Sequence, residues 1–181
     1  MGGLLDGYPR GPAYDEMFGA DALPHPHMRA LYNALQTLTG DDLAQRAAAQ
    51  DRSFRDQGVT FSHSGEEWVF PLDLIPRLIP AAEWQLVEAG VVQRVRALEA
   101  FLSDVYGPAE VVRDGVVPRS VLTTSAGFCR PAYGIQPPNG VRVHLAGIDL
   151  VRDQAGALRV LEDNLRVSSG MSYVVENRRT M

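Results

Sequence analysis

Apolar residues recur at helical spacing over long stretches of the chain. The longest stretch covers residues 81–106, where apolar positions step by three or four and predict one helix with a single buried face. These positions are Trp84, Val87, Val91, Val95, Leu98, Leu102 and Val105. Two shorter helices are expected over residues 24–40 and 43–57, and Asp41 or Asp42 is expected to cap the second of them.

Short runs of β-branched and aromatic residues predict strands between the helices. Such runs cover residues 59–61, 68–70 and 141–151, and residues 111–115 are expected to form a short strand or turn. Strands that lie between helical segments indicate an α/β fold, in which helices pack on a small mixed sheet.

Proline and glycine mark the irregular segments. Three prolines make residues 71–80 a rigid irregular stretch, because proline fixes φ and removes a backbone donor. Residues 127–140 are rich in both glycine and proline and predict a loop. Residues 1–24 contain five glycines and three prolines between aromatic residues, which indicates an extended N-terminal arm. We therefore expect an arm over residues 1–24 and a domain over residues 25–181.

Composition and charge exclude several classes of protein. The 181 residues carry 17 basic and 22 acidic side chains, a net charge of −5, without a basic block, which argues against nucleic acid as a partner. No apolar run approaches the roughly 20 residues that a membrane-spanning helix needs, so no membrane partner is expected. The single cysteine, Cys129, cannot form an internal disulfide and fits a reducing, cytoplasmic location.

The stretch from residue 145 to residue 164 predicts a β-hairpin. Residues 145–151 and 158–161 are rich in strand formers, and Ala155 with Gly156 can form a two-residue turn. With this loop, the numbers of facing residues add up to 311, so that Asp149 faces Glu162. Side chains alternate along a strand, so Glu162 shares its face with the residue two positions on, Asn164.

Two facing carboxylates destabilise a pair of strands unless a cation lies between them. Mg²⁺ is one such cation, because it binds carboxylate and amide oxygens, and it would take Glu162, Asn164 and Asp149 as ligands. The alternatives are that one carboxylate is solvated, or that it forms an ion pair with a neighbouring arginine. The candidate arginines are Arg152, Arg159 and Arg166.

Four segments resemble the circularly permuted ATP-grasp proteins related to glutathionylspermidine synthase. The longest is residues 162–178, which contains Glu162-x-Asn164, Arg166 and a Ser-Ser-Gly turn. The others are residues 14–18, 71–84 and 114–118, so the resemblance covers nearly the whole chain. It implies a partial ATP-grasp fold like that of glutathione synthetase, with residues 25–181 as the N-terminal part of the permuted domain. Because family members are much longer, the chain is expected to be an N-terminal fragment.

The resemblance also implies a chemistry, with Mg²⁺ and ATP as cofactors. In the wider group, a Glu-x-Asn pair and an upstream Asp bind the Mg²⁺ of Mg-ATP, and the matching positions here are Glu162, Asn164 and Asp149. Arg166 is expected to act catalytically by contacting phosphate. A helix over residues 171–181 should offer free amides to an anion at its start. The amides expected to bind the cofactor are those of Ser169, Gly170 and Met171.

Three functions follow from these expectations. The first is a part in the ATP-dependent joining of a small-molecule or peptide carboxylate to an amine through an acyl phosphate. The second is a non-catalytic, truncated scaffold or binding module, and the third is a metal-binding module without nucleotide chemistry. The nucleotide-binding lysines and adenine pocket of the family lie C-terminal to these motifs, so the 181 residues alone are expected to be inactive. As a truncated chain they are also expected to self-associate, through an uncovered sheet edge or the apolar surface of residues 71–80.

Overall fold

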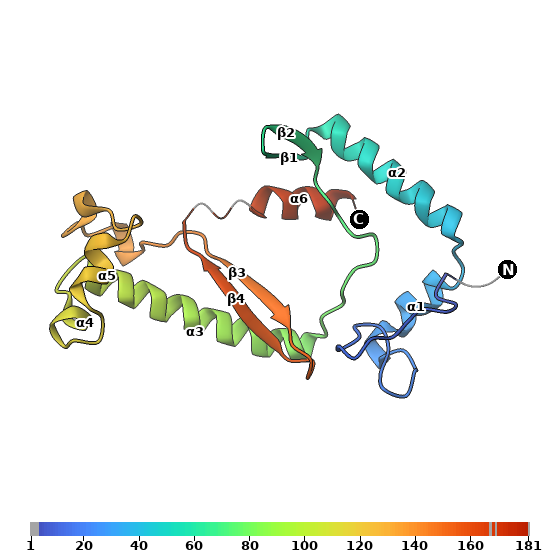
Figure 1. Ribbon diagram of the computed structural model, residues 1–181, viewed down its shortest axis with the longest axis horizontal. Coiled ribbons are helices and arrows are strands. Elements are labelled where there is room, and N and C mark those ends of the chain that lie inside the picture. Colours follow the sequence, from blue (N-terminus) through green and yellow to red (C-terminus); the bar gives the residue numbers. More distant parts are fainter. Residues whose placement is uncertain (1–3, 167, 169, 181) are drawn as a thin grey trace. The chain divides into compact units, whose positions relative to one another are not determined.

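The computed structural model of the chain describes residues 4–166, 168 and 170–180. The chain divides into two compact units. Unit 1 comprises Met1–Glu83, Leu150–Leu161 and Ser169–Met181, and unit 2 comprises Trp84–Asp149 and Glu162–Ser168. The helices and strands are labelled in Figure 1. They are α1 (Arg29–Leu35), α2 (Gly40–Gln57), β1 (Thr60–His63), β2 (Glu66–Val69), α3 (Ala81–Val105), α4 (Glu110–Arg113), α5 (Arg119–Thr124), β3 (Gly147–Arg152), β4 (Leu158–Asn164) and α6 (Gly170–Thr180), with 3₁₀ turns at Pro26–Met28, Arg130–Ala132 and Pro138–Gly140.

The predicted α/β class is confirmed, and the strands pair in an arrangement simpler than expected. They form two separate antiparallel pairs, β1 with β2 and β3 with β4, rather than one small mixed sheet. Residues 71–80 contain neither helix nor strand, as their prolines predict.

Helix α2 begins one residue before the expected cap. Thr39 is the N-cap: its hydroxyl accepts from the Asp42 amide at 3.2 Å, and the Asp42 carboxylate accepts from the Thr39 amide at 2.8 Å. This is a capping box, which satisfies two amides that the helix leaves free. The prediction of Asp41 or Asp42 as N-cap is therefore wrong, although Asp42 takes part in the cap. At the other end, Gly58 adopts φ +67° and closes the helix.

The core of unit 1 lies between the N-terminal segment and helix α1. Met17, Met28 and Leu35 are buried together, and Phe18 and Tyr32 pack against them. The two aromatic rings contact each other edge to face, with centroids 5.7 Å apart. Residues 4–24 therefore contribute side chains to the core of their own unit.

Helix α6 is attached to the first hairpin within unit 1. The hydroxyl of Tyr173 donates to the carbonyl of Thr60 at 2.9 Å, and its ring stacks on Phe70 with centroids 4.2 Å apart. The hairpin turns through Ser64 and Gly65, which both have positive φ.

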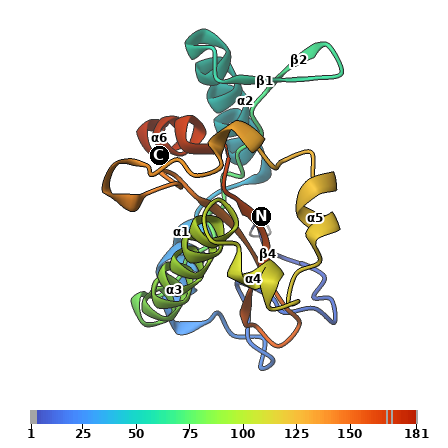
Figure 2. The ribbon, with the colours of Figure 1, turned by 90° about the vertical axis from the view of Figure 1, so that its left-hand side faces the viewer.

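Two carboxylates of α3 accept hydrogen bonds from backbone amides in later segments of unit 2. Glu99 accepts hydrogen bonds from the amides of Arg142 and Val143 at 2.7 and 2.9 Å. These amides therefore serve no strand, and β3 starts at Gly147 rather than at residue 141. Asp104 accepts from the amides of residues 110 and 111 at 2.8 and 3.0 Å. This side-chain cap supports the short helix α4, where a strand or turn was predicted; Figure 2 shows α4 and α5 following α3.

The turn of the second hairpin differs from the prediction by one residue. The amide of Asp153 donates to the carbonyl of Ala157 at 2.9 Å, and the amide of Gly156 donates to the carbonyl of Asp153 at 2.9 Å. The loop therefore contains three residues and ends on Gly156 at φ +84°, as in a type I turn followed by a G1 bulge. Near the turn the numbers of facing residues add up to 310, so the prediction of 311 is wrong there.

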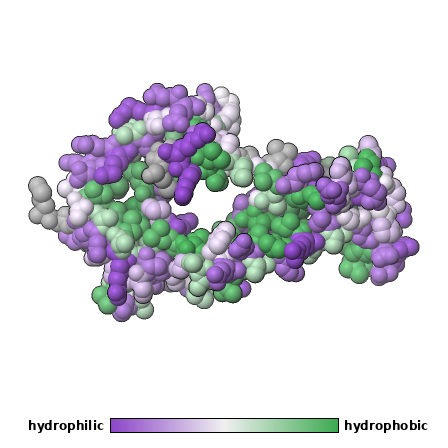
Figure 3. Space-filling view, turned by 180° about the vertical axis from the view of Figure 1, so that it is seen from behind, coloured by the Kyte–Doolittle hydropathy of each residue, from purple (hydrophilic) through white to green (hydrophobic). Residues whose placement is uncertain are grey.

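Few side chains of the described residues are fully buried. Large apolar residues that remain exposed include Leu86 at 78% and Leu161 at 69%, and apolar side chains reach the surface in Figure 3. The chain exposes 13085 Å². Two separate folded domains of about 10 kDa each would together expose only about 10,500 Å².

In the part of the chain that the structure describes, none of the helices is long and apolar enough to cross a membrane.

Candidate functional site

Three predicted side chains meet at the open end of the second hairpin. The Nδ2 of Asn164 donates to Glu162 Oε1 at 3.0 Å and lies 3.5 Å from Asp149 Oδ2. Asp149 and Glu162 are exposed, and Asn164 is half-buried. Both carboxyl groups therefore lie on the same face as one amide, open to solvent.

This convergence does not depend on the predicted loop length. Glu162 and Asn164 lie two residues apart on β4, so alternation places both on one face. The contact of 3.5 Å between Asn164 Nδ2 and Asp149 Oδ2 then brings Asp149 to this pair.

The opposite face of β4 is fixed by an ion pair that the sequence analysis missed. Arg94 of α3 holds Asp163 in a two-pronged contact, Nε to Oδ1 at 2.7 Å and Nη2 to Oδ2 at 2.6 Å. The hydrogen bond from Arg94 lowers the pKa of Asp163, and the pairing raises the pKa of Arg94. Because side chains alternate, holding Asp163 on one face directs Glu162 and Asn164 to the other. Arg94 gave no local signal, since its partner lies 69 residues away.

Two of the three arginines considered as partners of the carboxylates are engaged elsewhere. Arg152 binds Glu16 and Glu83, and Arg159 binds Asp153. The alternative ion pairs with Arg152 or Arg159 are therefore wrong. Arg166 is exposed two residues after the end of β4.

Gly170 and Met171, two of the residues predicted to bind an anion through their amides, belong to unit 1. Gly170 and Met171 are exposed in the first turn of α6, which belongs to unit 1. Ser169 lies outside the described residues. Its neighbour Ser168 donates from its hydroxyl to the carbonyl of Asn164 at 2.8 Å, which folds the chain back directly after β4.

The donor set suits a hard divalent cation with few protein ligands. Among the described residues there is no cluster of three or more His, Cys, Asp or Glu that could hold a metal ion. Here two carboxylates are joined by one amide, whose rotation by half a turn would point Oδ1 instead of Nδ2 at an ion. Mg²⁺ usually keeps several waters and takes one or two carboxylates together with phosphate oxygens, so this set fits it.

The comparison with known families decides the relationship of the chain. Residues 76–181, more than half of the sequence, match the family model described as a circularly permuted ATPgrasp. The chain belongs to the circularly permuted ATP-grasp family. The matched residues include the segments 114–118 and 162–178 and most of 71–84, and the resemblance is thus confirmed at the level of the family.

Curated relatives share most of the chain and extend beyond it. An uncharacterized protein of Mycobacterium tuberculosis (strain H37Rv) is 55% identical over 169 residues, which cover 93% of this chain and 31% of that protein. An uncharacterized protein of Synechocystis is 46% identical over 98% of this chain and 38% of its own length. A protein of Frankia alni, named provisionally as a glutamate–cysteine ligase, is 42% identical over 97% of this chain and 20% of its own length. The chain thus spans about a third of the first of these relatives.

Proposed function

We propose that this ATP-grasp chain supplies the Mg²⁺ ligands for an ATP-dependent ligase that joins a carboxylate to an amine through an acyl phosphate. The observation that carries the proposal is the convergence of Asp149, Glu162 and Asn164 on one exposed face. Membership in the ATP-grasp family and the ligase name of the Frankia relative support the same class of reaction.

Each residue has a distinct part in the proposal. Glu162 and Asp149 provide anionic oxygens, and Asn164 provides a neutral oxygen between them. A bound Mg²⁺ would neutralise phosphate charge during phosphoryl transfer. Arg166 would contact a phosphate or carboxylate oxygen through its guanidinium, which can bind two oxygens at once. The amides of Ser169, Gly170 and Met171 would bind an anion at the start of α6.

The ion pair between Arg94 and Asp163 matters for this function because it holds the proposed ligands Glu162 and Asn164 in position. Arg94 neutralises Asp163, so this carboxylate does not compete for the ion on the other face. With Asp163 held by two hydrogen bonds, Glu162 and Asn164 need little reordering when they bind.

Direct binding of Mn²⁺, a spectroscopic substitute for Mg²⁺, tests the proposal on the 181-residue chain. Glu162→Gln and Asp149→Asn should each weaken binding by about tenfold or more, measured by electron paramagnetic resonance, and Mg²⁺ should compete. Glu88→Gln is the matched control, because it removes an exposed carboxylate from unit 2 at a distance in sequence from the site. If Glu162→Gln and Glu88→Gln bind Mn²⁺ equally well, the metal site is not where we place it.

A second experiment addresses the reaction. In a chain extended to the length of the relatives, Mg²⁺-dependent formation of ADP should be lost on Glu162→Gln, and hydroxylamine should trap the acyl phosphate of the correct substrate. Binding of the ion without ATP-dependent chemistry in that extended chain would favour the metal-binding module instead. The single free Cys129 supports a reducing, cytoplasmic setting for this chemistry.

A further inference from the structure

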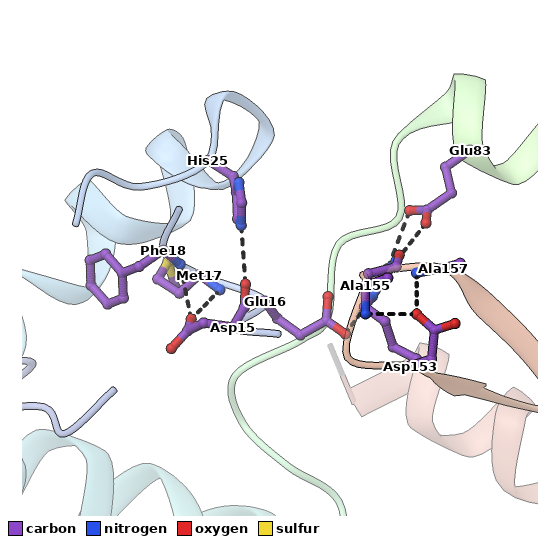
Figure 4. A network of polar contacts seen from close by, with 11 residues as sticks. Asp15, Glu16, Met17, Phe18, His25, Glu83, Asp153, Ala155 and Ala157 are labelled. Atoms are coloured by element: carbon purple, nitrogen blue, oxygen red, sulfur yellow. Dashed lines mark hydrogen bonds and ion pairs between the residues drawn. The ribbon is translucent and has the colours of Figure 1, made fainter. Parts of the chain in front are cut away.

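Residues 14–18, which the metal site does not use, make contacts on two sides. Asp15 accepts hydrogen bonds from the amides of Met17 and Phe18 at 2.8 and 2.9 Å, which fixes the backbone of the segment. Met17 is buried and Phe18 packs beside it, so these two residues anchor the segment in the core of unit 1. Glu16 instead extends toward the second hairpin, where it accepts a hydrogen bond from Arg152 (Figure 4). Tyr14 contacts the same arginine through its ring. We call residues 14–18 the docking segment.

The hairpin side of this contact centres on Arg152, the last residue of β3. Its Nε donates to Glu16 at 2.8 Å, and its Nη1 and Nη2 donate to the two oxygens of Glu83 at 2.6 and 3.2 Å. Nη1 also donates to the carbonyl of Gly156 at 2.6 Å. The side chain of Arg152 is 11% exposed. This largely buried guanidinium therefore links Glu16 of the docking segment, Glu83 in the first turn of α3 and Gly156 of the hairpin loop.

Tyr14 completes the contact by packing on the hairpin loop. Its ring lies under the guanidinium of Arg152, 5.1 Å from centroid to Cζ. A Cβ on Gly156 would lie 2.6 Å from Tyr14 Cε2, so only glycine permits this approach. Both the αL conformation of the loop and the absence of a side chain at Gly156 are therefore needed for the ring to dock.

We propose that the docking segment holds the metal-bearing hairpin in place, with Arg152 as the positioning residue. Arg152 lies three residues beyond Asp149 on β3, and the partner strand continues to Glu162. Fixing Arg152 to Glu16 and Glu83 limits the rocking and twisting of the hairpin that would separate the two carboxylates. The part of this proposal that concerns the ion rests on the proposed function.

The charges around Arg152 explain why its loss should matter more than the loss of a surface pair. Glu16 and Glu83 are both partly shielded and share one cation. Without the guanidinium they would repel each other, and the docking segment would move away from Glu83. Arg159 on the same hairpin is 67% exposed and forms its ion pair with Asp153 of the hairpin itself, so this pair contributes little to docking.

The test compares Arg152→Gln with Arg159→Gln, which remove the same charge from the same hairpin. The first readout is the nuclear Overhauser effect between the Tyr14 ring and the Gly156 Hα, together with amide exchange in β3 and β4. The second is the affinity for Mn²⁺. Arg152→Gln should abolish the Overhauser effect, speed exchange and weaken Mn²⁺ binding by about tenfold, the lower end of what loss of outer support costs a metal site. Arg159→Gln should leave all three unchanged.

Glu16→Gln keeps the Arg152–Glu83 pair and the core of unit 1. It therefore shows whether loss of the Tyr14–Gly156 contact occurs without unfolding of the unit. It should weaken the Tyr14–Gly156 contact while the signals of β1 and β2 stay in place. Persistence of the Overhauser effect in Arg152→Gln would overturn the docking role, and its loss with unchanged Mn²⁺ affinity would overturn the positioning role. If wild type binds no Mn²⁺, the proposed function fails, and faster hairpin exchange in Arg152→Gln than in Arg159→Gln still decides the docking role.

Discussion

Replacing Gly156 by alanine isolates the contact between the N-terminal segment and the hairpin loop. The added methyl group would lie 2.6 and 2.7 Å from two ring carbons of Tyr14. Carbon atoms prefer separations of about 3.5–4.0 Å, so the ring must move by about 1 Å or leave. The substitution also places a Cβ on a residue with φ +84°.

The size of the effect follows from these two terms. Alanine in the left-handed region costs about 1–2 kcal/mol relative to conformations it prefers. Displacing Tyr14 removes its packing on the loop and its cation–π contact with Arg152, which together contribute about 1–2 kcal/mol for a partly exposed ring. Gly156→Ala should therefore lower the free energy of unfolding by about 2–4 kcal/mol.

Gly65 offers a matched control within the same unit. It has φ +85° in the turn of the first hairpin, and a Cβ there would meet no atom within 4 Å. Gly65→Ala should thus cost only the backbone term. Thermal unfolding followed by circular dichroism should place the Tm of Gly156→Ala about 5 °C below that of Gly65→Ala.

A double substitution separates the contact from other causes. In a Tyr14→Ala background the ring is gone, so Gly156→Ala should cost no more than Gly65→Ala does there. Equal Tm values for the two glycine variants in the wild-type background would refute the reasoning, as would a penalty for Gly156→Ala that persists without Tyr14.

Three further outcomes can be measured directly. Thr39→Ala removes the capping box of α2 and should lower stability in urea by about 1 kcal/mol, whereas the exposed Thr37→Ala should change it little. The hydrogen bond from Arg152 lowers the pKa of Glu83 in the folded chain, so this pair contributes stability above the unfolded pKa of about 4.3 and loses it as pH falls further. Wild type should therefore exceed Glu83→Gln in stability at neutral pH, and the two should converge in acid; a constant difference would contradict this. Leu86→Glu, at a side chain 78% exposed, should reduce self-association in sedimentation velocity and change the stability by less than about 0.5 kcal/mol.

Helix α3 shows what a periodic pattern can predict. The apolar stripe from Trp84 to Val105 predicted a helix over residues 81–106, and the helix spans Ala81–Val105. Such a stripe is reliable because every turn of the helix repeats the same information. The stripe does not show which polar residues beside it bind distant segments, as Arg94 and Glu99 do.

Errors in the sequence analysis arose where a distant side chain satisfies the backbone. Asp104 caps α4 from the end of α3, and nothing within residues 110–113 indicates this cap. The loop at Gly156 was misread for a different reason, because both two-residue and three-residue hairpin loops can end on a glycine. Hydrogen bonds to Asp153 select the longer loop.

The candidate site was largely predictable because it depends on local alternation. Glu162 and Asn164 share a face in any extended strand, whatever its partner. The neighbouring position of Asp149 required a register that the turn alone does not give. The roles of these residues as Mg²⁺ ligands and of Arg166, Ser169, Gly170 and Met171 with phosphate stay predictions.

The pairing of Glu16 with Arg152 spans 136 residues of the sequence. At a synthesis rate of about 5–20 residues per second, Glu16 is made about 7–27 s before Arg152. During that interval the N-terminal segment can bury Met17 and Phe18, but Tyr14 and Glu16 must wait for the hairpin. Closure of unit 1 is therefore among the last events of translation of this segment.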